Sequence, residues 1–158
     1  MDTVHNSYRK QRIAHWDTVA QRMDRWKGWG GYYHQRLIQV YQYLVAPGQR
    51  VLEMGCGIGD LLSALKPSVG IGVDFSEKMV KQARQRHPEL HFILADVHEL
   101  KLGEKFDVII LSDLINDLWD VQTVFEQIAS LSTPHTRIIL NSYNRLWELP
   151  LTVAGKFG

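Results

Sequence analysis

The chain has 158 residues, enough for one domain with a buried core and too few for two domains of ordinary size. Apolar residues make up 45% of the chain and charged residues 22%, the proportions of an ordinary soluble globular protein. The formal net charge of +1 predicts no general attraction to nucleic acid or to an anionic membrane surface.

The cysteine content and the first residues bear on the compartment. A single cysteine, Cys56, rules out an internal disulfide and fits a reducing environment. The start of the chain lacks the basic and then apolar pattern of a signal peptide. No stretch approaches the roughly 20 apolar residues of a membrane span. We therefore expect a cytoplasmic protein without a membrane partner.

Two helices are predicted before residue 48, from about Ser7 to Lys27 and from about Tyr32 to Leu44, because apolar residues recur there at steps of three and four. Between them, Trp26–His34 mixes glycines with aromatic residues. This segment could fold over a bound ligand, or its aromatic side chains could cover a core. The apolar positions of the two helices are Ile13, Trp16, Val19, Ala20 and Met23, and then Leu37, Val40, Tyr41 and Leu44.

Strands and helices alternate after residue 49, which predicts right-handed crossovers and a doubly wound parallel α/β sheet. The apolar run Val108–Leu111 is typical of a strand that is covered on both faces. A further helix is expected to begin at Leu146. The expected strands are Arg50–Met54, Val69–Asp74, His91–Leu94, Lys105–Leu111 and Arg137–Leu140, and the expected helices are Ile58–Leu65, Ser76–Arg86 (with Met79, Val80 and Ala83 inward) and Asp120–Leu131 (with Val121, Val124, Phe125 and Ile128 on its apolar face).

The turn after the first strand has glycine at every second position, Gly55, Gly57 and Gly59. Glycine there permits a positive φ and leaves no Cβ to obstruct a ligand lying against the main chain. The helix that follows directs its unpaired N–H groups toward the same place. Strand, glycine turn and helix in this order form the nucleotide-binding corner of an open α/β sheet.

Two acidic residues indicate which nucleotide this corner takes. The dinucleotide fingerprint has its third glycine five residues after the first, whereas here the interval is four, which disfavours an NAD-dependent oxidoreductase. Glu53, at the end of a strand that should be apolar, suits a cofactor with a cationic amino-acid tail and would repel a pyrophosphate. Asp74 ends the second strand, the place from which a carboxylate accepts both hydroxyls of a ribose.

The motif E-x-G-x-G-x-G at 53–59, followed by G-V-D-F-S at 72–76, resembles the class I S-adenosylmethionine-dependent methyltransferases. The resemblance implies a Rossmann-like sheet of order 3-2-1-4-5 at residues 49–158, with residues 1–48 as a helical lid. It also implies that Phe75 or a neighbour flanks the adenine and that Asp96 and Val97 bind its edge, although Asp96 could instead be a helix cap. The implied cofactor-binding residues are Glu53, Gly55, Cys56, Gly57, Gly59, Asp74, Phe75, Met79, Asp96, Val97, Ser112 and Asp113.

The sequence names no obligatory catalytic residue. Methyl transfer from a sulfonium is an in-line displacement, so a general base is needed only when the acceptor must lose a proton. The segment after the fourth strand lacks the N-P-P-Y type motif of the members that methylate amide or nucleobase nitrogen. Candidates for acceptor contacts are Asp113, Asn116, Asp117, His15 and Tyr33, and no Cys/His spacing typical of a zinc site is present.

Further segments resemble the methyltransferase part of bacterial proteins that join a methyltransferase to a family 2 glycosyltransferase. They are Tyr32–His34, Gly59–Leu62, Leu111–Leu114, Asn116–Gln122 and Arg145–Glu148. This resemblance implies a small-molecule or glycan-related acceptor, methylated at oxygen. The alternative is a cofactor-binding module without activity of its own that serves another domain.

Class I methyltransferases usually have seven strands, and this sequence supplies five. The strand at Arg137–Leu140 would then be an uncovered edge, which tends to pair with another chain. The segment after Leu146 is also more apolar than a free tail should be. We therefore expect a longer polypeptide with a covalently linked C-terminal domain, and self-association of the isolated piece through this edge.

Overall fold

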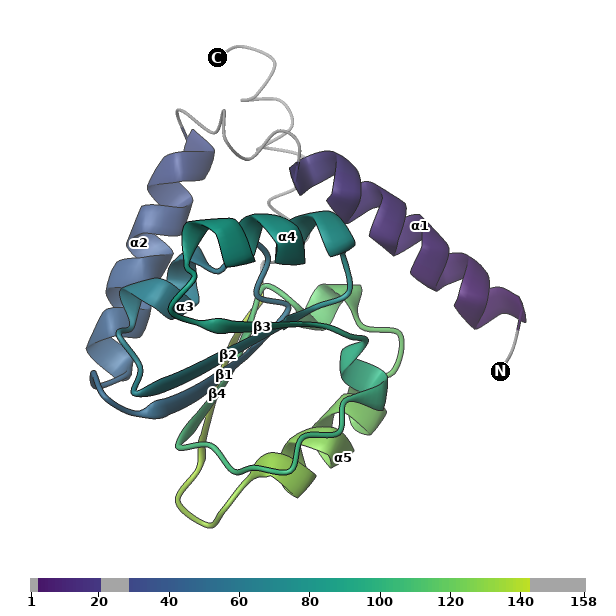
Figure 1. Cartoon of the computed structure of the whole chain (residues 1–158). Helices are drawn as coiled ribbons and strands as arrows, with labels where there is room; N and C mark the ends of the chain where they lie inside the picture. Colours follow the sequence, from purple (N-terminus) through teal and green to yellow (C-terminus); the bar gives the residue numbers. More distant parts are fainter. Residues whose placement is uncertain (1–2, 21–28, 143–158) are drawn as a thin grey trace.

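The computed structural model describes residues 3–20 and 29–142, which form a five-stranded parallel sheet with helices on both faces (Figure 1). The strand order is β3-β2-β1-β4-β5, which confirms the predicted order and the Rossmann-like fold. The strands are β1 (Arg50–Met54), β2 (Val69–Asp74), β3 (His91–Leu94), β4 (Val108–Ser112) and β5 (Arg137–Asn141). The helices are α1 (Thr3–Ala20), α2 (Trp29–Leu44), α3 (Asp60–Ala64), α4 (Glu77–Arg86) and α5 (Val121–Leu131), with 3-10 turns η2 (Val97–Glu99) and η3 (Ile115–Asp117).

The two faces of the sheet bury separate apolar clusters. Alternate residues of β1 and β4 point to opposite faces, so that both strands are buried on both sides, as their apolar runs predict. Figure 1 shows α3 and α4 on one face and α5 on the other. On the first face α2 adds Tyr41, which is 2% exposed. On the second face α5 packs Val124 and Ile128 against Ile109 and Leu111.

Side-chain caps fix where two helices begin. Ser76 Oγ accepts from the Met79 N–H, and Asp120 Oδ1 accepts from the Thr123 N–H. The predicted helices began at these two residues, and the structure makes both of them N-caps. The helix expected at Ile58–Leu65 is shorter, because Gly59 has φ +80° and only Asp60–Ala64 is helical.

Two predicted core positions are wrong. Val40 is 51% exposed, because α2 contacts the core through the neighbouring Leu37, Ile38 and Tyr41 instead. Val121 is 40% exposed, because it lies in the first turn of α5. The predicted helix positions beyond Ala20, among them Met23, and the helix expected from Leu146 lie outside the described residues.

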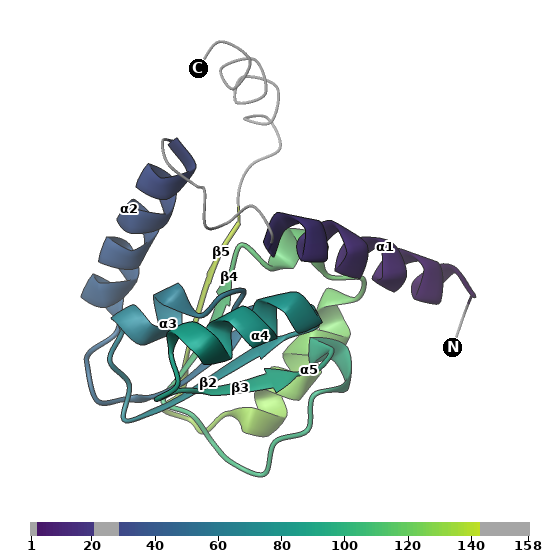
Figure 2. The ribbon, with the colours of Figure 1, turned by 45° about the horizontal axis from the view of Figure 1, so that its top comes forward.

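Among the described residues β5 pairs with β4 alone and forms one edge of the sheet (Figure 2). Ile138 and Leu140 stand beside Ile109 and Leu111 in register and are 42% and 47% exposed. The self-association predicted for this edge stays a prediction. Within 3–20 and 29–142, no helix combines the length and apolarity that crossing a bilayer requires.

A matched pair of glycine substitutions tests how the turn after β1 is packed. Gly48 and Gly59 have nearly equal φ angles, +82° and +80°, so alanine suffers similar backbone strain at both. A Cβ at Gly59 would lie 2.5 Å from Cζ of the buried Phe92, whereas one at Gly48 would meet nothing within 4 Å. Gly48→Ala should cost about 1 kcal/mol of unfolding free energy, and Gly59→Ala about 2–4 kcal/mol. Urea unfolding measures both, and equal losses would show that Phe92 does not constrain the turn.

Candidate active site

A cavity of about 350 Å³ opens at the carboxyl ends of β1, β2 and β4, between α1 and α2. This is where ligands lie in open α/β sheets. Most of the residues predicted to bind a cofactor line it: Glu53, Gly55, Cys56, Gly57, Asp74, Phe75, Met79, Ser112 and Asp113.

The floor of the cavity is the turn after β1, which is hydrogen-bonded to the end of β2. The N–H groups of Gly55 and Cys56 donate to the Val73 carbonyl at 2.8 and 3.0 Å, and the Gly57 N–H donates to Asp74 Oδ2 at 2.9 Å. A Cβ at Gly57 would project into open space, whereas one at Gly55 would lie 2.8 Å from Leu114. The turn therefore presents bare main chain to the cavity.

Glu53 is buried at the end of β1, with 3% of its surface exposed. Its Oε2 has no hydrogen-bond partner among the described residues. Burial raises the pKa of this carboxyl to about 8, the Leu62 N–H opposes that rise, and the negative charges of Asp74 and Asp60 add to it. A buried carboxyl in this state is a site for a cation, because ionisation becomes favourable when a positive group arrives.

Asp74 is 7% exposed and accepts from two backbone N–H groups, Ser76 to Oδ1 and Gly57 to Oδ2, both at 2.9 Å. Burial raises its pKa to about 6, and these N–H groups oppose the rise. Asp74 therefore holds the glycine turn in place, a role that the sequence analysis missed. Each oxygen retains further capacity to accept from a ligand hydroxyl.

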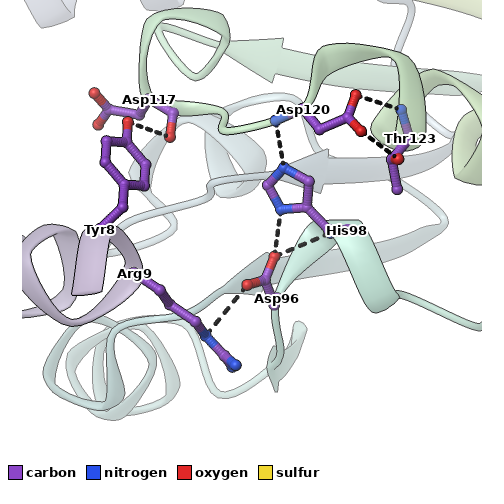
Figure 3. A network of polar contacts seen from close by, with 7 residues as sticks. All are labelled: Tyr8, Arg9, Asp96, His98, Asp117, Asp120 and Thr123. Atoms are coloured by element: carbon purple, nitrogen blue, oxygen red, sulfur yellow. Dashed lines mark hydrogen bonds and ion pairs between the residues drawn. The ribbon is translucent and has the colours of Figure 1, made fainter. Parts of the chain in front are cut away.

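A second, smaller hollow of about 30 Å³ lies between α1 and the turn after β3. Asp96 caps η2 there, with Oδ1 accepting from the backbone N–H of His98 at 3.0 Å and from its Nδ1 at 2.6 Å (Figure 3). The Asp120 N–H donates to His98 Nε2 at 3.2 Å, so the ring proton lies on Nδ1. Arg9 of α1 pairs with Asp96 Oδ2 at 3.2 Å.

Asp96 is thus a helix cap, which is the alternative that the sequence left open. Its negative charge is paired with Arg9. Burial alone would raise its pKa, but the His98 hydrogen bonds and the charge of Arg9 lower it. Val97 lines the same hollow. The contacts of Asp96 and Val97 with an adenine stay a prediction.

α1 is fastened across this end of the sheet through Asp117. Trp16 Nε1 donates to Asp117 Oδ2 at 2.7 Å, Tyr8 donates to the Asp117 carbonyl at 3.2 Å, and Arg12 forms an ion pair with the carboxylate. The ring of Tyr8 lies 5.3 Å from that of Trp119. Figure 3 shows the Tyr8 hydroxyl pointing toward Asp117 and the Arg9 side chain pointing toward Asp96. Of the predicted lid segment Trp26–His34, the structure describes the residues from Trp29 on.

Asp117, one of the candidates for acceptor contacts, is bonded to α1 as described above, and the other candidates have different positions. Asp113 lines the main cavity, and the Tyr33 hydroxyl donates to its carboxylate at 2.9 and 3.0 Å. His15 is exposed, with its ring 5.4 Å from that of Trp16, and lines neither hollow. Asn116 is half-buried in η3 and also lines neither. Gly59, predicted to contact the cofactor, lines neither hollow, and a Cβ there would meet the ring of Phe92.

The sequence analysis missed His34, a half-buried residue of α2 that lines the main cavity. It precedes Leu37 and Ile38, which also line the cavity, by three and four residues, so the helical period could have placed it on that face. No cluster of three or more His, Cys, Asp or Glu side chains suited to a metal ion occurs among residues 3–20 and 29–142.

Residues 46–157 match the family model described as a methyltransferase domain. The chain is 30% identical over 128 residues to the ubiquinone biosynthesis O-methyltransferase of Coxiella burnetii, covering 76% of this chain and 55% of that protein. It is 31% identical over 125 residues to a probable S-adenosylmethionine-dependent methyltransferase of Mycobacterium tuberculosis, covering 75% of this chain and 45% of that protein. The chain thus spans about half the length of these relatives.

The fold is similar to that of magnesium protoporphyrin IX methyltransferase from Synechocystis, solved with bound S-adenosylmethionine. The TM-score is 0.70 at 22% identity, over 87% of this chain and 77% of that chain. At this identity the similarity concerns the fold alone.

The buried carboxyl of Glu53 predicts a stability that depends on pH. Its folded-state pKa of about 8 lies above the ordinary 4.5, so the folded state holds this proton more tightly and loses stability as the pH rises between those values. Glu53→Gln removes the loss. Relative to the parent, the melting temperature of the variant should therefore gain roughly 6–13 °C between pH 5.5 and pH 8.5, because about 3 kcal/mol of stability is lost by the parent over that range.

The matched control is Glu126→Gln, on the exposed side of α5. Its melting temperature should follow that of the parent at every pH. Parallel curves for Glu53→Gln and the parent would contradict the raised pKa of Glu53.

Proposed function

We propose, because this chain belongs to the methyltransferase domain family, that it binds S-adenosylmethionine in the main cavity and transfers the methyl group to an oxygen of a small-molecule or glycan-related acceptor. One observation carries the choice of cofactor. Glu53 is a buried carboxyl with an unpartnered oxygen, beside a turn that presents bare main chain. A cationic amino-acid group satisfies such a carboxyl.

The residues present fit this cofactor. Glu53 would hold the ammonium group and Asp74 the ribose hydroxyls, while Gly57 lets the ligand lie against the main chain. Phe75, Asp96 and Val97 line the smaller hollow, where the adenine would lie. A dinucleotide fits poorly, because its pyrophosphate would face the carboxyls of Glu53 and Asp74.

When bound, S-adenosylmethionine supplies a methyl group on a positively charged sulfur. The protein contributes by orienting both reactants and excluding water. Trp16 and Leu114 border the cavity with apolar surface, and the α2 residues Gly31, His34 and Gln35 border the side that would receive the acceptor.

Oxygen is proposed as the acceptor atom because one of the relatives at 30% identity is named as an O-methyltransferase. The glycan-related acceptor rests on the sequence resemblance to proteins that join a methyltransferase to a glycosyltransferase. The alternative function is a cofactor-binding module that serves an attached domain, and activity against an acceptor separates the two.

The test combines binding and turnover. Calorimetry should show binding of S-adenosylmethionine and none of NAD. Transfer of a labelled methyl group is then measured against neutral monosaccharides, phenols and amines. Transfer to hydroxyl acceptors supports the proposal, transfer to amines alone contradicts the acceptor atom, and binding without transfer to any acceptor favours the module.

Asp74→Asn tests the contact with the ribose. The one side-chain oxygen that remains can still accept a hydrogen bond from one of the two backbone N–H groups that Asp74 binds. Hydrogen bonds to a charged group contribute roughly 1.5–3 kcal/mol each, so S-adenosylmethionine should bind about 10- to 100-fold more weakly. Asp120→Asn, which alters a helix cap that lines neither hollow, is the control and should bind as the parent does. If Asp74→Asn is folded and its affinity is unchanged, Asp74 does not hold the ribose.

A further inference from the structure

Asp113 occupies a strained position directly after β4. Its φ of +54° lies in the left-handed region, which costs a residue other than glycine of the order of 1 kcal/mol. Such a conformation persists only where the surroundings enforce it. Here the Tyr33 hydroxyl of α2 donates to both carboxylate oxygens, and Asn141 at the end of β5 donates from Nδ2 to Oδ1 at 2.5 Å.

The orientation of Asn141 is itself fixed. The hydroxyl of the buried Tyr41 donates to Asn141 Oδ1 at 2.7 Å, which leaves the amide nitrogen facing Asp113. Two elements, α2 and β5, therefore hold one carboxylate at the wall of the cavity. Burial raises the pKa of the Asp113 carboxyl, and the hydrogen bonds from Tyr33 and Asn141 oppose that rise because they favour the charged form. The carboxylate is thereby held as a negative charge beside the cavity.

His34 lies on the same wall, one residue after Tyr33, whose ring centroid is 5.5 Å from that of His34. Burial lowers the pKa of its ring, while the negative charges of Asp113 and Asp60 act in the opposite direction. The ring is therefore neutral at pH 7, and the cation formed when it gains a proton has two carboxylates nearby. The other titratable groups that line this cavity are Glu53, Cys56, Asp74 and Asp117.

Acidic groups dominate the charge of the cavity lining. Glu53, Asp60, Asp74, Asp113 and Asp117 line it, and no Lys or Arg does so within the described part of the chain. A phosphorylated or carboxylated acceptor would be repelled there. This charge balance disfavours anionic acceptors, whereas an acceptor with a neutral hydroxyl group meets no such repulsion.

We infer, on the basis of the proposed function, that His34 is the base that removes the proton from a neutral hydroxyl acceptor, and that the negative charge of Asp113 stabilises its charged form. The acceptor oxygen forms a bond to the methyl carbon as the carbon–sulfur bond breaks. The sulfur keeps that electron pair and becomes neutral. The hydroxyl proton passes to a ring nitrogen of His34, which becomes the cation beside Asp113.

His34→Gln tests the base, and His91→Gln is its matched control, because His91 is exposed at the start of β3 and lines neither hollow. With the best neutral hydroxyl acceptor of the parent, His34→Gln should lower kcat by roughly 10²- to 10⁴-fold. Its affinity for S-adenosylmethionine should stay within about twofold, and the fall of kcat toward acid pH should disappear. His91→Gln should match the parent in all three.

The effect of the Asp113 charge on the titration of His34 is measured in the cofactor-free protein, by NMR of the His34 ring. Asp113→Asn keeps the shape and the left-handed conformation but removes the charge, so the His34 ring should titrate at lower pH than in the parent.

The acceptor class is tested by comparing methylation of glucose with that of glucose 6-phosphate, and methylation of catechol with that of benzoate derivatives. In each pair the neutral acceptor should be methylated faster.

The outcomes distinguish a failure of the proposed function from a failure of the inference about His34 and Asp113. A parent that binds no S-adenosylmethionine, or methylates no hydroxyl, contradicts the proposed function and this inference together. An active parent whose kcat survives His34→Gln within about threefold overturns the inference alone. An unchanged His34 titration in Asp113→Asn, or a preference for the anionic acceptors, also overturns it.

Discussion

The site depends on the hydrogen bonds between the turn after β1 and the last residues of β2. The Val73 carbonyl accepts from two consecutive N–H groups, and Asp74 accepts from a third. These bonds hold a turn with φ values of +72°, +52° and +80° at its glycines, a conformation that other residues adopt only at a cost. Because the turn is fixed, Glu53 beneath it and Asp74 beside it have fixed positions in the cavity wall.

The burial of these two carboxyls prepares the site for a ligand but lowers the stability of the unliganded fold. Glu53 and Asp74 are both nearly buried, and burial raises the pKa of each. A buried carboxyl without a positive partner is costly, whereas one that meets a ligand cation becomes part of the binding energy. The same residues that make the empty domain less stable at high pH would thus select a cationic ligand.

Much of the fold could be predicted because the signals are local. β1, β2 and β3 have the bounds predicted from their apolar runs and flanking glycines, and Ser76 and Asp120 cap helices as their side chains favour. The positions of the glycine turn, Glu53 and Asp74 could also be predicted, because a strand, glycine turn and helix in this order commonly form a nucleotide-binding corner.

The residues that α1 and α2 bring to the cavity could not be predicted from the sequence. The contacts of Tyr33 with Asp113, Asn141 with Asp113 and Arg9 with Asp96 join residues far apart in the sequence, so no periodicity encodes them. The helical period places His34 on the same face as Leu37 and Ile38, but nothing in the sequence shows that this face meets the cavity. His15, predicted to contact the acceptor, is exposed and lines neither hollow.

The most direct test of the account is the number of protons released when S-adenosylmethionine binds, measured by calorimetry at pH 6.5 in two buffers with different ionisation enthalpies. Glu53, whose pKa is about 8 in the empty cavity, must ionise to meet the ammonium group, so binding should release about one proton. In Glu53→Gln the release should disappear and the affinity should fall. Binding of equal affinity in both proteins, with no proton released by the parent, would contradict the assignment of Glu53 as the cofactor's anchor.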